Sequence, residues 1–245
     1  MKKTLMAILL CCTGTLAHAE LVSDTLDVDR EVTSVKDINK VSLDKKGKDS
    51  KVNMSFHLAL GFSTMVGVPA DYTVKVGPAL ENSWSLNVDW RPFGKKNEWS
   101  LGFGIGWRHY RFGNATYLSK DAQGVIGQTP YPDGLSDRRS TMRIFSLQVP
   151  IMYTHNFDQK GRWSVSLGAI VNFNTGARST RSYTLNEEDY SINTYKIEQR
   201  PVTIDAMLVV ETPYFLPLYC KYSPMSVFKK DRGPKMHQLS FGIFI

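Results

Sequence analysis

Histidine is the side chain that most often transfers protons near neutral pH. Beyond the N-terminal segment, the sequence holds His57, His109, His155 and His237. None of them belongs to an HExxH motif or lies at a paired metal-ligand spacing, and no GxSxG or Walker-type loop occurs. The sequence therefore predicts no catalytic group, no metal site and no cofactor.

The acidic triplet Glu187-Glu188-Asp189 is a weaker candidate for chemistry. Carboxylate oxygens suit hard divalent cations, so three of them in one loop are compatible with cation binding. A solvated loop explains three adjacent acidic residues more simply. We adopt the solvated loop as the expectation.

Basic residues gather in three places and are suited to binding anions. The planar guanidinium of arginine can bind a phosphate through two parallel hydrogen bonds. The clusters comprise Arg138 and Arg139, Arg178 and Arg181, and the group Lys229, Lys230, Arg232 and Lys235. Ordinary solubility charge is the alternative interpretation of these clusters.

The elements that must position these residues are β-strands. In residues 81–94, Trp84, Leu86, Val88 and Trp90 alternate with polar side chains, and a period of two predicts a strand with one apolar face. The same alternation recurs often enough to predict eight strands and no helix. The strand segments are 56–62, 81–94, 99–113, 143–157, 162–174, 201–211, 215–224 and 235–245.

The connections between these segments alternate between long and short along the chain. The short ones are PFGKKNE, FDQKGR and TPY, and the long ones span residues 64–78, 113–140, 176–195 and 226–234. Short turns at one end and long loops at the other are typical of outer-membrane barrels. The expected fold is all-β: an eight-stranded antiparallel transmembrane β-barrel with an up-and-down meander.

Aromatic residues lie near both ends of successive strands, as in the girdles that flank a lipid-facing band. Trp99 and Trp107 are about 26 Å apart along their strand, or roughly 20 Å along the normal of a tilted barrel. This height is close to the apolar band of an outer-membrane barrel. The predicted girdles comprise Trp84, Trp90, Trp99, Trp107, Tyr153, Trp163 and Phe173.

Charged residues are expected on the opposite face of the strands, inside the barrel, where opposite charges can pair. The inward glycines Gly102, Gly104 and Gly106 would leave room for long arginines from opposite strands. The predicted interior network comprises Asp89, Arg91, Arg108, Arg143, Asp205, Glu211 and Lys221.

The N-terminus predicts export. A basic start, a short apolar stretch and Ala17-His18-Ala19 indicate a signal peptide over residues 1–19, followed by a flexible periplasmic arm over 20–51 and the barrel over 52–245. A lipoprotein anchored at Cys11 or Cys12 is the alternative. Beyond the signal peptide only Cys220 remains, which excludes an internal disulfide. The net charge of +7 favours anionic lipid or glycan phosphates over nucleic acid.

Two segments resemble the small outer-membrane β-barrel proteins of Bacteroidetes, the PorT-like group. SLQVPIMYTHNF, residues 146–157, is similar to that group's aliphatic-Pro-aliphatic strand, and residues 222–245 are similar to its closing hairpin. The resemblance implies a membrane subunit of an envelope or secretion assembly. The chain departs from the outer-membrane pattern in ending on Ile245, with Phe244 penultimate.

Three functions are therefore open. The first is a non-enzymatic outer-membrane protein of a Gram-negative bacterium, with a structural or interaction role and with its N-terminal arm and C-terminus in the periplasm. Its partners would be membrane lipid, other envelope proteins and lipopolysaccharide, contacted through Arg138, Arg139, Arg178, Arg181, Lys229 and Lys230. The second is a lipid A-modifying enzyme, a deacylase or acyltransferase, with His109 and His237 as candidates. The third is a soluble lipocalin-like carrier.

Overall fold

The computed structural model describes residues 51–68, 74–94, 96–158 and 162–245. The predicted signal peptide, and all of the predicted arm except Lys51, lie outside the described residues. In the part of the chain that is described, no helix is long and apolar enough to cross a membrane.

The described chain is all-β, as the alternation of its residues predicts. Its strands are β1 (Val52–Val66), β2 (Val74–Trp90), β3 (Asn97–Phe112), β4 (Thr116–Lys120), β5 (Ile126–Pro130), β6 (Ser136–Asn156), β7 (Ser164–Leu185), β8 (Glu188–Tyr195), β9 (Val202–Glu211), β10 (Leu218–Ser223) and β11 (His237–Phe244).

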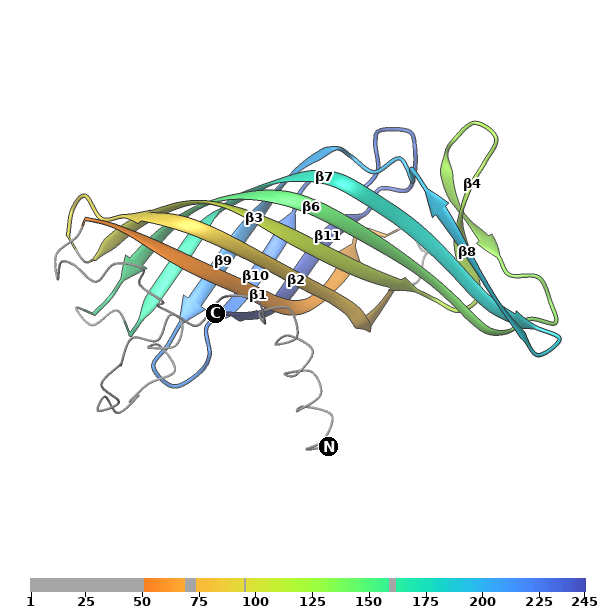
Figure 1. Cartoon of the computed structure of the whole chain (residues 1–245), viewed down its shortest axis with the longest axis horizontal. Coiled ribbons are helices and arrows are strands. Elements are labelled where there is room, and N and C mark those ends of the chain that lie inside the picture. Colours follow the sequence, from red (N-terminus) through yellow and green to blue (C-terminus); the bar gives the residue numbers. More distant parts are fainter. Residues whose placement is uncertain (1–50, 69–73, 95, 159–161) are drawn as a thin grey trace, which may run out of the picture. The chain divides into compact units, whose positions relative to one another are not determined.

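Eight of these strands form a closed antiparallel ring (Figure 1). Around the ring the order is β1, β2, β3, β6, β7, β9, β10 and β11, and pairing of β11 with β1 and of β6 with β7 completes it. Each ring strand lies beside the next ring strand in the sequence. The predicted eight-stranded antiparallel meander is therefore confirmed.

Two of the predicted long loops contain additional strands, so their prediction as loops was wrong, and the loop predicted over 64–78 is shorter than expected because β1 runs to Val66 and β2 begins at Val74. The segment 113–140 holds the hairpin of β4 and β5 as well as the start of β6. The segment 176–195 continues β7 beyond the ring and adds β8, which pairs with β7 and with no other described strand. The segment 176–195 is rich in threonine, serine and tyrosine, and threonine and tyrosine favour strands. It nevertheless lacks the alternation of apolar and polar residues that marks a half-buried strand.

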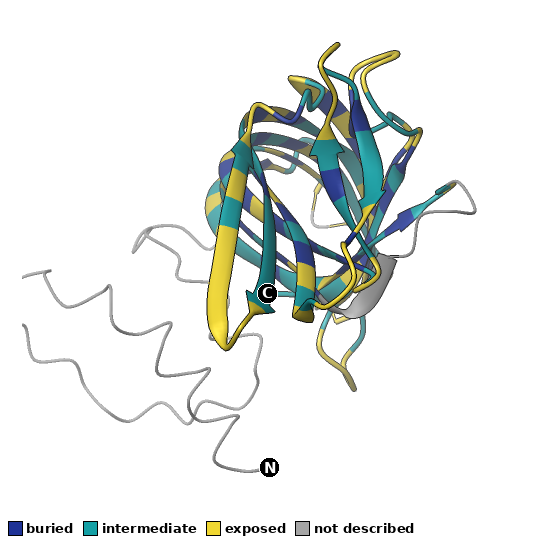
Figure 2. Ribbon diagram, turned by 90° about the vertical axis from the view of Figure 1, so that its right-hand side faces the viewer, coloured by how far each residue is buried: buried dark blue, intermediate teal, exposed yellow. Residues whose placement is uncertain are grey.

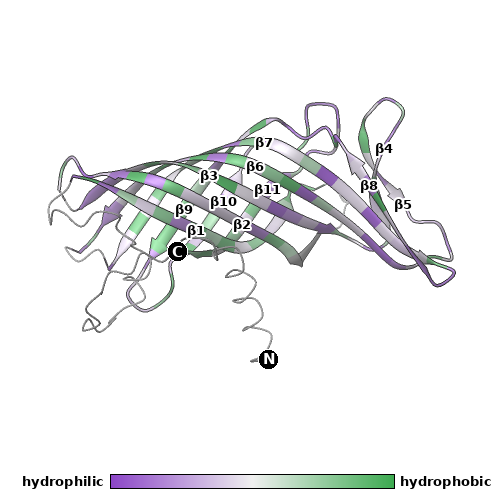
Figure 3. Ribbon diagram, viewed as in Figure 1, coloured by the Kyte–Doolittle hydropathy of each residue, from purple (hydrophilic) through white to green (hydrophobic). Residues whose placement is uncertain are grey.

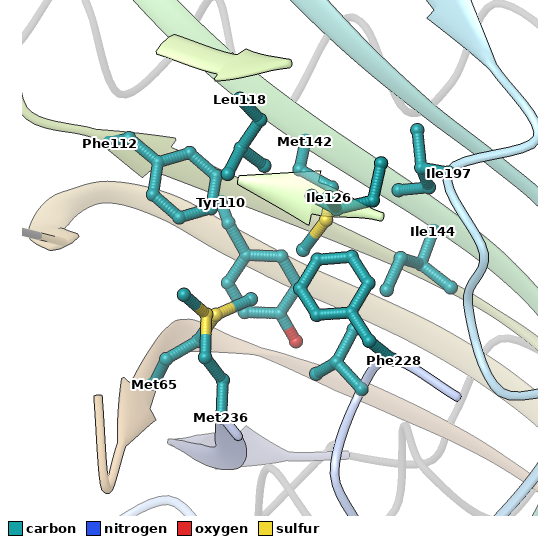
Figure 4. Close-up of a cluster of buried hydrophobic side chains, with 11 residues drawn as sticks. Met65, Tyr110, Phe112, Leu118, Ile126, Met142, Ile144, Ile197, Phe228 and Met236 are labelled. Carbon is teal, nitrogen blue, oxygen red and sulfur yellow. The ribbon is translucent and has the colours of Figure 1, made fainter. Parts of the chain in front are cut away.

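Along the ring strands, buried and exposed residues alternate (Figure 2), so each strand has one face inside the ring and one outside. The interior is not polar throughout, contrary to expectation. Toward the long-loop end it holds an apolar cluster of Met65, Tyr110, Phe112, Leu118, Ile126, Met142, Ile144, Ile197, Val227, Phe228 and Met236 (Figure 4). A second apolar cluster comprises Ala59, Met152, Ile170, Met207, Val209 and Tyr219.

The inward glycines of β3 have a different role from the one predicted. A Cβ at Gly102 would collide with Asn87, and a Cβ at Gly106 would collide with the amide of Gln148. At Gly104 the obstacle is the backbone of β2. The space beside β3 is therefore occupied by amide side chains and by a closely approaching strand, not by arginines from opposite strands.

A bulge in β7 sets which way its outer half faces. Phe145 pairs with Gly176 and Leu147 pairs with Phe173, so β7 carries one more residue than β6 between these pairs. The extra residue reverses the alternation, because a shift of one residue turns every later side chain to the other face. Asn172 and Asn174 are buried before the bulge, whereas Ser179 is buried after it.

Candidate functional site

The outer face of the ring is apolar between two rows of aromatic residues. In one row, Trp90, Trp99 and Tyr153 are direct neighbours across β2, β3 and β6. In the other, Trp107 contacts Phe145, with ring centroids 5.2 Å apart. Exposed side chains between the rows include Phe56, Leu86, Val88, Leu101, Phe103, Ile151, Leu167, Ile204, Leu208 and Phe241. We call this surface the apolar belt.

No charged residue occupies an outward position between the aromatic rows in the described ring strands. All seven residues of the predicted girdles lie on the outward face; Trp163 lies beside Tyr214 and Trp84 beside Trp107. Soluble monomers rarely expose so large a continuous apolar surface, because each Å² costs roughly 25 cal/mol in water. The belt is therefore the part of the described surface that water solvates least favourably.

Inside the ring, ionised side chains are buried and paired. Arg108 donates through Nη1 to Asp205 Oδ2, at 3.3 Å, and to the Gln238 side chain. Its Nη2 donates to Ser146 Oγ at 3.1 Å. Lys221, 3% exposed, forms an ion pair with the fully buried carboxylate of Glu81.

The predicted interior network is correct in part. Asp89, Arg108, Asp205 and Lys221 are buried inward, and Asp89 accepts a hydrogen bond from Ser100 at 2.6 Å. Arg91 and Glu211 are half-buried at strand ends, where Arg91 pairs with Glu98.

Arg143 was wrongly assigned to the interior. It is exposed on the outer face, because it shares the parity of Phe145 and Leu147 on β6. Glu81 was missed, although it shares the polar parity of Ser83 and Asn87 and could have been found by that signal.

Beyond the Trp107–Phe145 row, polar and basic side chains replace the belt on the outer face of β3, β6, β7 and β8. They line a groove of about 390 Å³. We call it the basic groove, and its residues are His109, Arg139, Thr141, Arg143, Arg178, Thr180, Ser182, Ser191 and Asn193. In Figure 3, hydrophilic bands lie on β6 and β7 near β8.

Strand register places three basic residues of the groove in one row and Arg139 further out. His109 pairs with Arg143, which pairs with Arg178, and Tyr195 of β8 completes the row. Arg111 begins the next row outward, beside Thr141. The bulge in β7 is essential to this arrangement, because without it Arg178 would face the interior.

The basic groove has no internal counter-charge. Arg139, Arg143 and Arg178 form no ion pair with any residue that the structure describes. Directly opposed like charges destabilise a sheet, and Arg143 faces Arg178 across β6 and β7. Nε2 of His109 and Nε of Arg111 are buried without a hydrogen-bond partner in the described chain. The groove can therefore accept an anion with several charged donors.

The six residues predicted to contact lipopolysaccharide do not form one cluster. Arg139 and Arg178 line the basic groove. Arg181 has the opposite parity and stacks on Tyr117, with its guanidinium carbon 4.6 Å from the ring centroid. Arg138 is half-buried outside the groove lining, Lys229 pairs with Glu198, and Lys230 is exposed.

The two candidate catalytic histidines do not share a site. His109 lies on β3 and His237 on β11, with β1 and β2 between them in the ring. Among the described residues, no cluster of histidine, cysteine or carboxylates could hold a metal ion. Of the acidic triplet, Glu187 lies in the turn between β7 and β8, and Glu188 and Asp189 begin β8. Asp189 accepts a hydrogen bond from Thr184, and Glu188 accepts one from Tyr190.

Three long connections are bound together above the interior apolar cluster. We call them the loop cap, comprising residues 113–135, 196–201 and 224–236. Glu198 accepts hydrogen bonds from Lys120, at 2.9 Å, and from Lys229, at 3.1 Å. These bonds lower the pKa of Glu198 to about 2. The guanidinium of Arg232 donates to the Gln123 carbonyl at 2.6 Å, which joins the first connection to the third.

No family model, curated protein or solved structure matches the chain. The resemblance to the PorT-like group therefore stays a prediction.

Proposed function

We propose that the chain is an integral β-barrel protein of the outer membrane of a Gram-negative bacterium. The supporting observation is the division of charge between its two faces. In the ring strands as far as the structure describes them, outward positions between the aromatic rows carry no charge, whereas Arg108, Asp205, Glu81 and Lys221 are paired inside. This division of charge stabilises the folded chain when lipid hydrocarbon surrounds the ring.

The proposed role is structural or interactive rather than catalytic. An eight-stranded barrel has an interior that side chains fill, and here two apolar clusters and the Arg108 network fill it. The surfaces left for partners are the loop cap, the basic groove and the short turns. Recruitment into an envelope or secretion assembly would use these surfaces.

The proposed orientation follows from the positions of the turns. The backbone N–H of Arg91 donates to the Lys51 carbonyl at the end of the ring that carries the short turns, and the last residue of β11, Phe244, pairs with Ala59 in the middle of β1 and donates to the Pro217 carbonyl near the short turn before β10. Short turns face the periplasm in outer-membrane barrels. The N-terminal arm and the C-terminus would then be periplasmic, and the loop cap would face outward.

Membrane integration is tested by extraction and by heat-modifiable migration. The full chain, expressed in a Gram-negative host, should resist extraction by salt and alkali, dissolve in detergent, and migrate differently on a gel before and after boiling. A chain that is recovered in aqueous buffer without detergent contradicts the proposal and favours the lipocalin-like carrier.

A lipid A-modifying activity is tested separately. Mass spectrometry of lipid A from cells with and without the protein should give identical acyl compositions. A changed acyl composition that is lost in His109→Ala or His237→Ala would replace the proposed role by an enzymatic one.

A further inference from the structure

We propose that the basic groove binds the phosphate of a phosphorylated glycolipid in the outer leaflet, with the lipid's acyl chains lying on the apolar belt beneath. This inference rests on the proposed membrane location. It differs from general contact through basic loops, because it assigns the headgroup to a strand-built site on one side of the ring.

No acidic side chain of the described residues neutralises the charge of the groove, so an anion from outside can bind there. His109, Arg143 and Arg178 lie side by side in one row, and Arg139 lies further out on β6. Phosphate oxygens accept parallel hydrogen bonds from guanidinium groups, and two opposed arginines can share one phosphate. A bound phosphate would attract both guanidinium groups and would offset the repulsion between Arg143 and Arg178.

The height of the groove on the ring selects a lipid phosphate over a free one. Arg143 lies two residues beyond Phe145, and this spacing is about 7 Å along the strand. Aromatic girdles mark the level of lipid headgroups, so the arginine row lies at the level of headgroup phosphates. Immediately below lie the exposed side chain of Trp107 and the half-buried side chain of Phe145, which can contact acyl chains.

The rest of the lining suits a sugar. Thr141 and Thr180 are direct neighbours across β6 and β7, and Thr180 donates to Asn193 Oδ1 at 2.7 Å. Ser182 donates to Ser191 Oγ at 3.4 Å on the adjoining row. Hydroxyl and amide groups can hydrogen-bond to sugar hydroxyls. Two of them, on Ser191 and Asn193, belong to β8, which lies beside the groove because β7 extends past the ring. The volume of about 390 Å³ is adequate for a phosphorylated sugar.

Native mass spectrometry of the purified full chain in detergent tests the site. The probes are diphosphoryl lipid A, the same lipid without phosphates, and inorganic phosphate. We expect diphosphoryl lipid A to bind at least tenfold more tightly than the dephosphorylated lipid. Inorganic phosphate should bind much more weakly than either, since it cannot contact the belt.

The double variant Arg143→Gln/Arg178→Gln should weaken binding of diphosphoryl lipid A by tenfold or more, because each charged hydrogen bond is worth about one power of ten in affinity. Binding of the dephosphorylated lipid should not change. The matched control is Arg162→Gln/Lys230→Gln, which removes the same charge from exposed positions outside the groove. Ser191→Glu, at an exposed position on β8, tests the same charge in a second way, because it adds a negative charge to the groove and keeps both arginines.

Three results would overturn the inference: equal binding of the two lipids, equal weakening by the control variant, or binding of inorganic phosphate as tight as that of the lipid. The last result would indicate a free-phosphate site. Failure of this inference leaves detergent dependence and heat-modifiable migration intact. Failure of the proposed membrane location removes both properties, so the two failures are distinguishable.

Discussion

Arg143 and Arg178 lie directly opposite each other on β6 and β7, and neither forms an ion pair with a described residue. Two like charges in this position are unfavourable in the absence of an anion. The arrangement depends on the bulge at Phe145–Gly176, which turns Arg178 outward. The repulsion between these two arginines therefore lowers the stability of the sheet at one place on its outer face, and a bound anion would offset it.

Neutralising one of the two arginines should stabilise the lipid-free protein. We expect Arg143→Gln or Arg178→Gln to raise the free energy of unfolding in detergent by about 0.2–1 kcal/mol, because the opposed charges no longer repel. Urea titrations followed by the gel shift between folded and unfolded forms measure this change. A loss of stability in either variant would mean that the arginine already has a stabilising partner.

The buried pair of Glu81 and Lys221 should show strong coupling. Lys221→Met should lower the free energy of unfolding by about 3–5 kcal/mol, since it leaves an uncompensated carboxylate inside the ring. The double variant Glu81→Gln/Lys221→Met should recover most of that loss, because Arg108 and Asp205 still balance each other.

The exposed ion pair of Asp158 and Arg162 provides the control for this pair. Arg162 Nε and Asp158 Oδ2 are 3.0 Å apart at a short turn that water reaches. Since exposed ion pairs contribute little, Arg162→Met should change the free energy of unfolding by less than about 1 kcal/mol. Equal effects of Lys221→Met and Arg162→Met would contradict a buried pair in the interior.

The apolar belt can be tested with one substitution at two places. Phe103 is 59% exposed near the middle of the belt, and Phe93 is 80% exposed in a short turn. If hydrocarbon surrounds the belt, Phe103→Arg should cost about 2–4 kcal/mol, whereas Phe93→Arg should cost about 0–1 kcal/mol. In an aqueous environment both substitutions would be tolerated, because both side chains are exposed. Folding into lipid vesicles at increasing urea concentration measures both costs.

Acid should loosen the loop cap. The pKa of Glu198 is lowered from 4.5 to about 2 by its hydrogen bonds to Lys120 and Lys229. A group whose pKa is lower in the folded state stabilises that state fully above its unfolded pKa, and this stabilisation is lost as the pH falls from about 4.5 toward 2. Hydrogen exchange in residues 113–135 should therefore increase over this pH range, after correction for intrinsic rates.

The variant Glu198→Gln is the control for the acid effect. It should show the faster exchange at neutral pH and little further change on acidification, because it has no carboxylate to protonate. An acid response of equal size in Glu198→Gln would assign the effect to other groups.

Much of the ring follows from local alternation. Trp84, Leu86, Val88 and Trp90 share a face wherever the strand lies, because successive side chains of a strand point to opposite sides. The same argument places Arg108, Asp205 and Lys221 inside, and applied strictly it would have placed Arg143 outside and Glu81 inside. The polar stretch 176–195 carried no such signal, so the extension of β7 and the presence of β8 could not be inferred from it.

The sequence by itself determined the eight strands of the ring and the two faces of most of them, since these depend on the period of the backbone, but not β4, β5 or β8. Only the tertiary structure decided which residues meet. The extra residue in β7 turns Arg178 toward Arg143, β8 adds the far side of the basic groove, and Glu198 joins two distant loops. These features depend on strand register and on contacts between residues far apart in the chain, which no local pattern encodes.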